Sequence, residues 1–326
     1  MNSYFKTILY FSVILVLAMI GCKKESSGEK VYKIAFASFG PDIAADLTIK
    51  GYLDGLKEAG FVEGKNLEVT KFHAAGDMGN IPMMMKNADF KDYDLLVPMS
   101  TPCLAAAFSG VKNTKMVFCY VYDPIAAGAG KSFTEHHKLA TGVGSFPPLE
   151  ETFKFVKELI PDVKRIGVVY NSSEANSRKV VEEGKKILDN MGIELVEVTI
   201  TSTNEITQAS ESLVSKNIQC AWGCGDNTLL QGFSGLVKAA RKAKVPLVIN
   251  DPEFVGEGAL AAVGIGWYET GMASSKLAAR VLNGEDPDKI PIENVAVKKL
   301  IVNNKIAKEL NLKIPDTFLA EAEVLN

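Results

Sequence analysis

Residues 165–177, RIGVVYNSSEANS, join an apolar run to a polar segment that leads into a stretch with helical periodicity. The Ile and Val side chains of residues 166–169 favour a β-strand, and the apolar spacing of residues 174–191 favours an amphipathic helix. The polar residues between them therefore stand where a strand ends and a helix begins. A strand followed directly by a helix is the repeating unit of a parallel sheet that helices cover.

The same unit recurs on both sides of this segment. The predicted strands are residues 31–39, 66–74, 94–100, 115–121, 165–171, 194–200, 219–225, 246–250 and 296–303. The predicted helices are residues 42–59, 81–90, 102–111, 149–159, 174–191, 205–216, 227–243 and 268–282. Short strands rich in Val and Ile, separated by helices, predict an α/β protein, and two successive sets predict two doubly wound parallel-sheet lobes.

Residues 141–148, TGVGSFPP, have the Gly and Pro content of a crossing between the lobes. If the last long helix rejoins the first lobe and the last strand joins the second, the lobes share three crossings, which form a multi-strand hinge. We therefore expect an N-terminal lobe of residues 31–143 plus 266–286 and a C-terminal lobe of residues 147–262 plus 293–326. A ligand cleft would lie between them.

The amino terminus reads as an export signal, because Lys6 precedes an apolar stretch from Thr7 to Ile20. That stretch is shorter than the ~20 residues that cross a bilayer. Met19 to Cys22 resembles the lipobox of bacterial lipoproteins, in which cleavage before the Cys leaves a lipidated amino terminus. This predicts a signal peptide of residues 1–21, lipid on Cys22 and a flexible tether of residues 22–30. An ordinary secretory signal and an uncleaved anchor are the alternatives.

The composition argues against nucleic acid as a partner. Removal of residues 1–21 leaves 326 − 21 = 305 residues with 35 basic and 39 acidic side chains, a net charge of −4. Four cysteines remain besides Cys22, and all four lie in apolar runs, where Cys acts as a small hydrophobic residue. We expect buried free thiols at the following positions: Cys103, Cys119, Cys220 and Cys224.

Motifs for catalysis, nucleotides and metals are missing or incomplete. Residues 123–132, DPIAAGAGKS, come close to a phosphate-binding loop but carry Ile125 where its first Gly is needed. The chain has neither a G-x-S-x-G nor an H-E-x-x-H motif. We therefore expect neither a metal nor a cofactor, although a catalytic dyad assembled from distant residues stays open.

Polar residues cluster just after the predicted strands, where open parallel sheets bind ligands at helix amino termini. These clusters are residues 100–102, 123–124, 171–177, 226–228 and 250–252. Helix capping alone would explain a single Ser, Thr or Asp at such a place. Ser172, Ser173 and Asn176 together exceed what one cap requires. Asp226 could either cap a helix or meet a cationic group of a ligand.

The chain resembles a known family over almost its whole length, the substrate-binding lipoproteins of ABC transporters for tryptophan and tyrosine. The matching stretches are GYLDGLKEAGFVEGKNLEV, STPCLAAAF, YDPIAAG, KRIGVVYNSSEANS, GDNTLL and GALAAVGIGWYETG. The resemblance implies the periplasmic-binding-protein type I fold. It also implies a receptor without catalytic activity that closes on a small amino-acid-like ligand, with an aromatic side chain as one option, and delivers it to an ABC permease.

The resemblance also implies a site and a location. The ligand carboxylate would meet polar groups of the segment 171–177 with help from the first lobe, and Asp226 would face the ligand amino group. The expected ligand-binding residues are Thr101, Asp123, Ser172, Ser173, Asn176, Ser177, Asp226, Asn227 and Asp251, with Phe39, Tyr122 or Phe254 covering the ligand side chain. The receptor would be a monomer, held by its lipid on the periplasmic or extracellular face of a bacterial membrane.

Two other functions use the same fold. A sensory receptor would pass the ligand signal to a membrane partner, and it needs the same cleft as a transport receptor. An exported enzyme would convert the ligand, so turnover would accompany binding. The sequence does not separate the two receptors, and it favours either of them over the enzyme.

Overall fold

The computed structural model describes residues 30–294 and 297–326, which form two β-sheets. The first sheet has the strand order β11-β5-β4-β3-β1-β2, and its strands pair in parallel. Its strands are β1 (Tyr32–Ser38), β2 (Leu67–His73), β3 (Leu95–Pro98), β4 (Met116–Val121), β5 (Ala140–Gly144) and β11 (Glu293–Asn294). Strand β1 comes first in sequence among the strands of this sheet and lies between β3 and β2, so the strand order reverses beside it, as in a doubly wound sheet.

The second sheet has the order β13-β12-β10-β9-β8-β6-β7. Its strands are β6 (Arg165–Asn171), β7 (Glu194–Ile200), β8 (Cys220–Gly223), β9 (Leu247–Ile249), β10 (Ala261–Ile265), β12 (Lys298–Asn303) and β13 (Glu323–Leu325). The pair β10–β12 is antiparallel, and every other neighbouring pair in this order is parallel. We call the part built on the first sheet the first lobe and the part built on the second sheet the second lobe.

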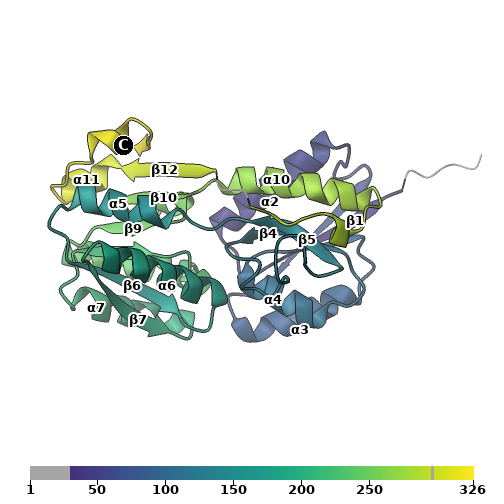
Figure 1. Cartoon of the computed structure of the whole chain (residues 1–326), viewed down its shortest axis with the longest axis horizontal. Coiled ribbons are helices and arrows are strands. Elements are labelled where there is room, and N and C mark those ends of the chain that lie inside the picture. Colours follow the sequence, from purple (N-terminus) through teal and green to yellow (C-terminus); the bar gives the residue numbers. More distant parts are fainter. Residues whose placement is uncertain (1–29, 295–296) are drawn as a thin grey trace, which may run out of the picture. The chain divides into compact units, whose positions relative to one another are not determined.

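Helices cover both faces of the first sheet (Figure 1). The alternation along β1 explains this, because Ile34 and Phe36 pack into the core under α2, whereas Ala35 and Ala37 pack into a separate core under α3 and α4. The helices of this lobe are α2 (Ile43–Glu58), α3 (Ile81–Asp89), α4 (Thr101–Gly110) and α10 (Trp267–Leu282), with short 3₁₀ turns η1 (Met78–Asn80) and η4 (Pro287–Lys289).

Helix α10 is far from α2 in sequence but packs directly on it. A Cβ on Gly51 would lie 2.1 Å from the Tyr268 carbonyl oxygen, and one on Gly271 would lie 2.1 Å from the Thr48 carbonyl oxygen. Only glycine permits this approach of the two backbones. The contact holds α10 in the first lobe and so fixes the position of Trp267, its first residue.

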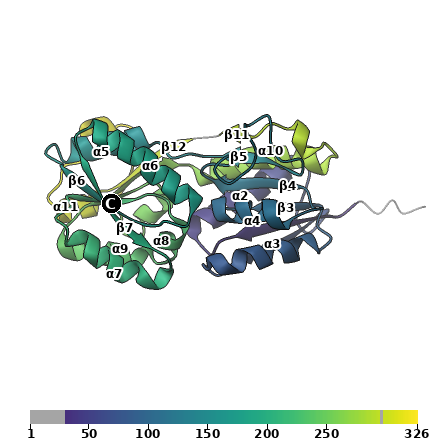
Figure 2. The same cartoon turned by 60° about the horizontal axis from the view of Figure 1, so that its bottom comes forward.

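Helices also cover both faces of the second sheet, α5 and α6 on one and α7 and α9 on the other (Figure 2). The core is aromatic on the α5 side, where Trp222 of β8 packs edge-on against Phe153 with ring centroids 4.9 Å apart. The helices of this lobe are α5 (Leu149–Leu159), α6 (Ala175–Asn190), α7 (Ile206–Val214), α8 (Asn227–Gln231), α9 (Phe233–Ala243), α11 (Asn304–Glu309) and α12 (Asp316–Leu319), with η2 (Thr203–Glu205) and η3 (Pro252–Val255).

The observed architecture confirms the predicted fold class of two α/β lobes with mainly parallel sheets. The chain passes between the sheets after Gly144, after Ile265 and after Asn294. The four cysteines expected as buried free thiols are free and buried. The ranges assigned to each lobe stay predictions. The predicted signal peptide and Cys22 lie outside the described residues.

Two predicted elements were wrong in detail. Residues 227–243 form two helices, α8 and α9, because Gly232 leaves helical geometry with φ −125° and ψ 26°. A Cβ there would also lie 2.5 Å from Ile206 Cδ1. The crossing expected from residue 141 begins later, because residues 140–144 are β5. Within the described part of the chain, no helix is both long enough and apolar enough to cross a bilayer.

Candidate functional site

A cavity lined by residues of both lobes lies where strands of both sheets end. The first lobe lines it with residues that follow β3, belong to or follow β4, or begin α10: Ser100, Thr101, Tyr120, Tyr122 and Trp267. The second lobe lines it with residues that follow β6, β8 and β9: Asn176, Gly225, Asn227 and Asp251. The cavity therefore occupies the carboxyl end of both parallel sheets, the place where such sheets bind ligands.

The amino terminus of α4 forms the polar wall of the first lobe. Neither Ser100 nor any other side chain caps this helix, and Pro102 stands in its first turn. The hydroxyl oxygens of Ser100 and Thr101 are buried and have no hydrogen-bond partner. Unused hydroxyls cost free energy when buried, and the helix end carries a partial positive charge. This wall is therefore suited to an anionic group.

Two residues of the same wall have a backbone conformation that L-residues rarely adopt. The φ angle is 80° at Ser100 and 58° at Tyr120, where the register of β4 against β5 shifts. The two residues support each other, because the Ser100 main-chain N–H donates to the Tyr120 carbonyl oxygen over 3.0 Å. Strained backbone of this kind persists where the surroundings hold it, and it concentrates at functional sites.

Three aromatic rings form the apolar part of the lining. Tyr122 and Trp267 stack with ring centroids 5.8 Å apart and an interplanar angle of 16°. Tyr120 meets Trp267 edge-on, with centroids 4.5 Å apart. Aromatic clusters with polar tips offer a rigid surface to an organic ligand.

Asp251 is the charged residue of the lining and is almost fully buried, with 1% of its surface exposed. It accepts hydrogen bonds from the Tyr122 hydroxyl and from Trp267 Nε1, each over 3.3 Å. Burial raises the pKa of Asp251 to about 8, and the negative charges of Glu253 and Asp42 add to the rise. The lining residues include neither Lys nor Arg, so a cationic ligand group would supply the missing counter-charge.

The segment 171–177 contributes less to the cavity than the sequence suggested. Ser172 and Ser173 are exposed and lie outside the lining. Ser177 is buried but donates to Asp226 over 2.6 Å. Asn176 does line the cavity, and its Oδ1 is buried without a partner. One side chain of this segment is therefore aimed at the cavity.

Asp226 has its hydrogen-bonding capacity filled from within the second lobe. Besides the Ser177 hydroxyl, it accepts the main-chain N–H of Asn171 over 2.8 Å and that of Leu229 over 2.7 Å, which caps α8. Burial and then the charge of Glu174 raise the pKa of Asp226. The cavity lining includes Asp251 and omits Asp226.

The structure brings four of the nine predicted binding residues to the cavity: Thr101, Asn176, Asn227 and Asp251. Asp123 is half-buried outside it and accepts the Ala126 main-chain N–H over 2.9 Å. Of the aromatic candidates, Tyr122 lines the cavity, whereas Phe39 and Phe254 lie in the apolar cores. Sequence reasoning missed Trp267, although its place just after a strand and at the start of a helix was the same signal that identified the others.

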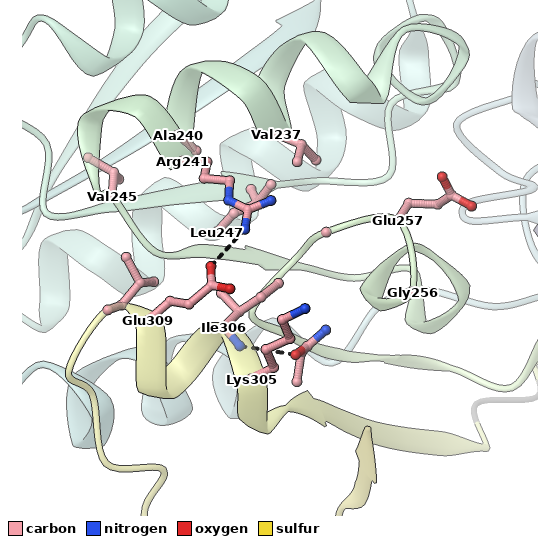
Figure 3. Close-up of a pocket in the computed structure, with 13 residues that line it drawn as sticks. Val237, Ala240, Arg241, Val245, Leu247, Gly256, Glu257, Lys305, Ile306 and Glu309 are labelled. Atoms are coloured by element: carbon pink, nitrogen blue, oxygen red, sulfur yellow. Dashed lines mark hydrogen bonds and ion pairs between the residues drawn. The ribbon is translucent and has the colours of Figure 1, made fainter. Parts of the chain in front are cut away.

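A wider groove lies elsewhere in the second lobe, between α9, α11 and the turn at Gly256 (Figure 3). Arg241 and Glu309 form an ion pair of 2.9 Å across it. None of the unpartnered buried side-chain atoms found in the described residues belongs to its lining. We therefore place the candidate site at the smaller cavity between the lobes. The described residues contain no cluster of His, Cys, Asp and Glu able to hold a metal ion.

The arrangement of two α/β lobes is also the fold of a solved glucose-galactose binding protein from Geobacillus stearothermophilus, with a TM-score of 0.61 and 15% identity over 84% of this chain and 98% of that one. The chain belongs to the family of ABC transporter substrate binding proteins, whose model matches residues 33–325. Its function is accordingly that of an extracytoplasmic substrate-binding protein of an ABC importer.

Individual relatives agree with this assignment. The chain is 28% identical to a tyrosine-binding protein of Clostridioides difficile over 290 residues, which are 89% of this chain and 84% of the relative. A conserved domain protein from Vibrio cholerae O1 biovar El Tor has a similar structure, with a TM-score of 0.88 and 32% identity over 91% of this chain and all of that one. The ABC domain from Streptococcus pneumoniae in complex with L-Trp has a TM-score of 0.86 and 31% identity over the same shares.

Proposed function

We propose that the cavity binds a zwitterionic amino acid with an aromatic side chain. The observation that carries this proposal is the set of three buried polar atoms without partners that surround it, Ser100 Oγ, Thr101 Oγ1 and Asn176 Oδ1. Buried polar atoms are normally satisfied, so three unsatisfied ones around one cavity support a ligand site there. The relatives named for tyrosine and crystallised with L-Trp indicate the ligand class.

The two ends of the amino acid are assigned by chemistry. The ligand carboxylate would accept hydrogen bonds from the Ser100 and Thr101 hydroxyls at the positive end of α4, a helix of 10 residues. The ligand ammonium would donate to Asp251 and to Asn176 Oδ1, both of them acceptors. This proposal transfers to Asp251 the role that the sequence suggested for Asp226.

The ligand side chain would lie against the rings of Tyr120, Tyr122 and Trp267. Tyr122 and Trp267 come from the first lobe, and both donate to Asp251 of the second. Closure of the lobes around the ligand would therefore assemble the site, as in hinge-closing receptors. We propose that the lobes have the ranges predicted from the sequence, except that residues 144 and 293–294 belong to the first lobe because they pair in its sheet. We also propose that the receptor works as a monomer.

Isothermal titration with L-tyrosine and L-tryptophan tests the proposed site. The variants Thr101→Val and Asp251→Asn are expected to weaken binding at least tenfold, because each removes a group that would meet a charge of the ligand. Ser172→Ala is the matched control, since that side chain is exposed outside the cavity. Equal affinities in all four proteins would remove the cavity from consideration.

We propose that the ligand leaves unchanged and that lipid on Cys22 holds the receptor at the membrane. The lining includes the hydroxyls of Ser100 and Thr101 but no His to activate either of them as a nucleophile. Mass spectrometry of ligand recovered after incubation should show the starting amino acid, and a converted product would indicate an enzyme.

The lipid anchor has a separate test. Cys22→Ser should release the protein from the membrane fraction, and retention would argue against the lipid anchor.

A further inference from the structure

Glu174 lies beside the cavity as a fully buried carboxylate, at the junction between β6 and α6. It accepts five hydrogen bonds from three residues. On Oε2 these come from Asn227 Nδ2 over 2.6 Å, the Asn227 main-chain N–H over 3.1 Å and Asn176 Nδ2 over 3.3 Å. On Oε1 they come from the Thr228 hydroxyl over 2.7 Å and its main-chain N–H over 2.9 Å. Glu174 therefore occupies the amino terminus of α8 as a bound anion would.

This carboxylate determines how two cavity-lining amides are turned. The Asn176 and Asn227 side chains both line the cavity, and both direct their amide nitrogen to Glu174. The Asn176 nitrogen is held further by the Ser177 hydroxyl oxygen and the Gly225 carbonyl. An Asn side chain has one donor group and one acceptor oxygen. With the nitrogens engaged, the oxygens remain for the cavity, and Asn176 Oδ1 has no partner.

The second-lobe wall of the cavity consequently presents acceptors. Asn176, Asn227 and Asp251 belong to the same lining. Three acceptors around one cavity would match the three N–H donors of a primary ammonium group and repel a carboxylate. The first-lobe wall, with the Ser100 and Thr101 hydroxyls at a helix amino terminus, has the opposite preference.

Asp226 reinforces the arrangement from the other side. It accepts the Ser177 hydroxyl hydrogen, so the Ser177 oxygen is left to accept from Asn176 Nδ2. The two acids thus take part in one connected set of donors and acceptors behind the cavity. A neutral amide in place of Glu174 would disrupt this set, because its own NH₂ would face the main-chain N–H of Asn227 or that of Thr228, which can only donate.

We infer that Glu174 is a specificity-determining positioning residue that turns the Asn176 and Asn227 oxygens into the cavity and so selects a ligand with a primary ammonium group. The inference rests on the proposed function for the identity of the ligand, but the orientation of the two amides can be tested without any ligand. Glu174 touches no ligand in this scheme and acts through the two amides.

Hydrogen exchange of the side-chain NH₂ groups, followed by NMR on the ligand-free protein, provides the first test. The NH₂ groups of Asn176 and Asn227 are expected to exchange at least tenfold more slowly than that of the exposed Asn190. In Glu174→Gln at least one of them should speed up tenfold. Exchange of both groups at the Asn190 rate in the unmodified protein would overturn the inference, so this measurement decides even if the variant does not fold.

Selectivity between an amino acid and its desamino analogue provides the second test. The probes are L-tyrosine with 3-(4-hydroxyphenyl)propionate and L-tryptophan with indole-3-propionate, measured by titration calorimetry. The preference for the amino acid is expected to fall at least tenfold in Glu174→Gln and to stay unchanged in Glu182→Gln, an exposed position of the same helix. A merely structural role would weaken both probes of a pair equally, and an unchanged ratio would overturn the inference. Failure of both amino acids to bind the unmodified protein would refute the proposed function, while the exchange measurement would still decide the role of Glu174.

Discussion

Binding of the amino acid is expected to tighten steeply between pH 6 and pH 8, because Asp251 must lose a proton before it can pair with the ligand ammonium. Burial, together with the charges of Glu253 and Asp42, raises the pKa of Asp251 to about 8 in the ligand-free protein. The protonated form cannot supply the negative charge that the ammonium requires. At lower pH the cost of ionising this carboxyl group therefore offsets a larger part of the binding free energy.

The size of the effect follows from that pKa. For a group with a pKa near 8, the free-energy cost of ionising it weakens binding about 100-fold at pH 6 and about twofold at pH 8. The dissociation constant should thus fall about 50-fold over this interval, which corresponds to about 2.3 kcal/mol. Near pH 7 binding should release about 0.9 proton for each ligand bound, provided that the ligand lowers the pKa of Asp251 below 6.

Titration calorimetry in buffers of different ionisation enthalpy measures both quantities. L-Tyrosine or L-tryptophan serves as the ligand, and Asp251→Asn serves as the variant that keeps the shape and removes the titrating group. The variant should bind weakly with an affinity that changes less than fivefold over the same pH range. A dissociation constant independent of pH in the unmodified protein, or the same slope in the variant, would show that Asp251 does not meet the ammonium.

Three further outcomes are expected. Gly225→Ala would place a Cβ 2.0 Å from the Tyr122 hydroxyl oxygen, on a residue whose φ is 72°. Titration should show at least tenfold weaker binding, with the circular dichroism spectrum unchanged. Full affinity would contradict the contact between the lobes. The melting temperature of the ligand-free protein should fall as the pH rises from about 4 to 8. Burial raises the pKa of Asp251 to about 8 and that of Glu253 to about 7, so the stability that depends on their bound protons is lost as they ionise. A melting temperature that rises over this range would contradict the assignment. Asp89→Ala removes the acceptor of five hydrogen bonds from the loop after α4. Urea titration should therefore show a loss of about 2–3 kcal/mol of unfolding free energy. A loss below about 0.5 kcal/mol would show that these hydrogen bonds do not stabilise the fold.

Much of the fold could be predicted because its signals are local. The continuous apolar run of β1 and the apolar faces of helices such as α6 are set by residues close together in sequence. Elements that depend on distant partners were not predicted. Strand β5 carries two glycines in five residues and is held by pairing with β4, and β13 is three residues paired to β12.

The candidate site could be predicted in position but not in detail. The polar residues after β3, β6, β8 and β9 were recognisable as the rim of a cleft, and Thr101, Asn176, Asn227 and Asp251 do line the cavity. The sequence did not show which of the other polar groups remain available to a ligand. Ser177 and Asp226 resemble ligand contacts in sequence, but they bind each other in the folded protein.

The sequence by itself determined which segments become strands and helices and which polar residues stand at the ends of the strands, because hydrophobic periodicity and capping preference act between near neighbours. Only the tertiary structure decided which of those polar groups stay unpaired. Glu174 meets Asn227 across 53 residues of sequence, and Asp226 meets Ser177 across 49. A buried hydrogen-bond donor or acceptor pairs with the partner that the fold brings near it, so its availability to a ligand depends on the folded chain.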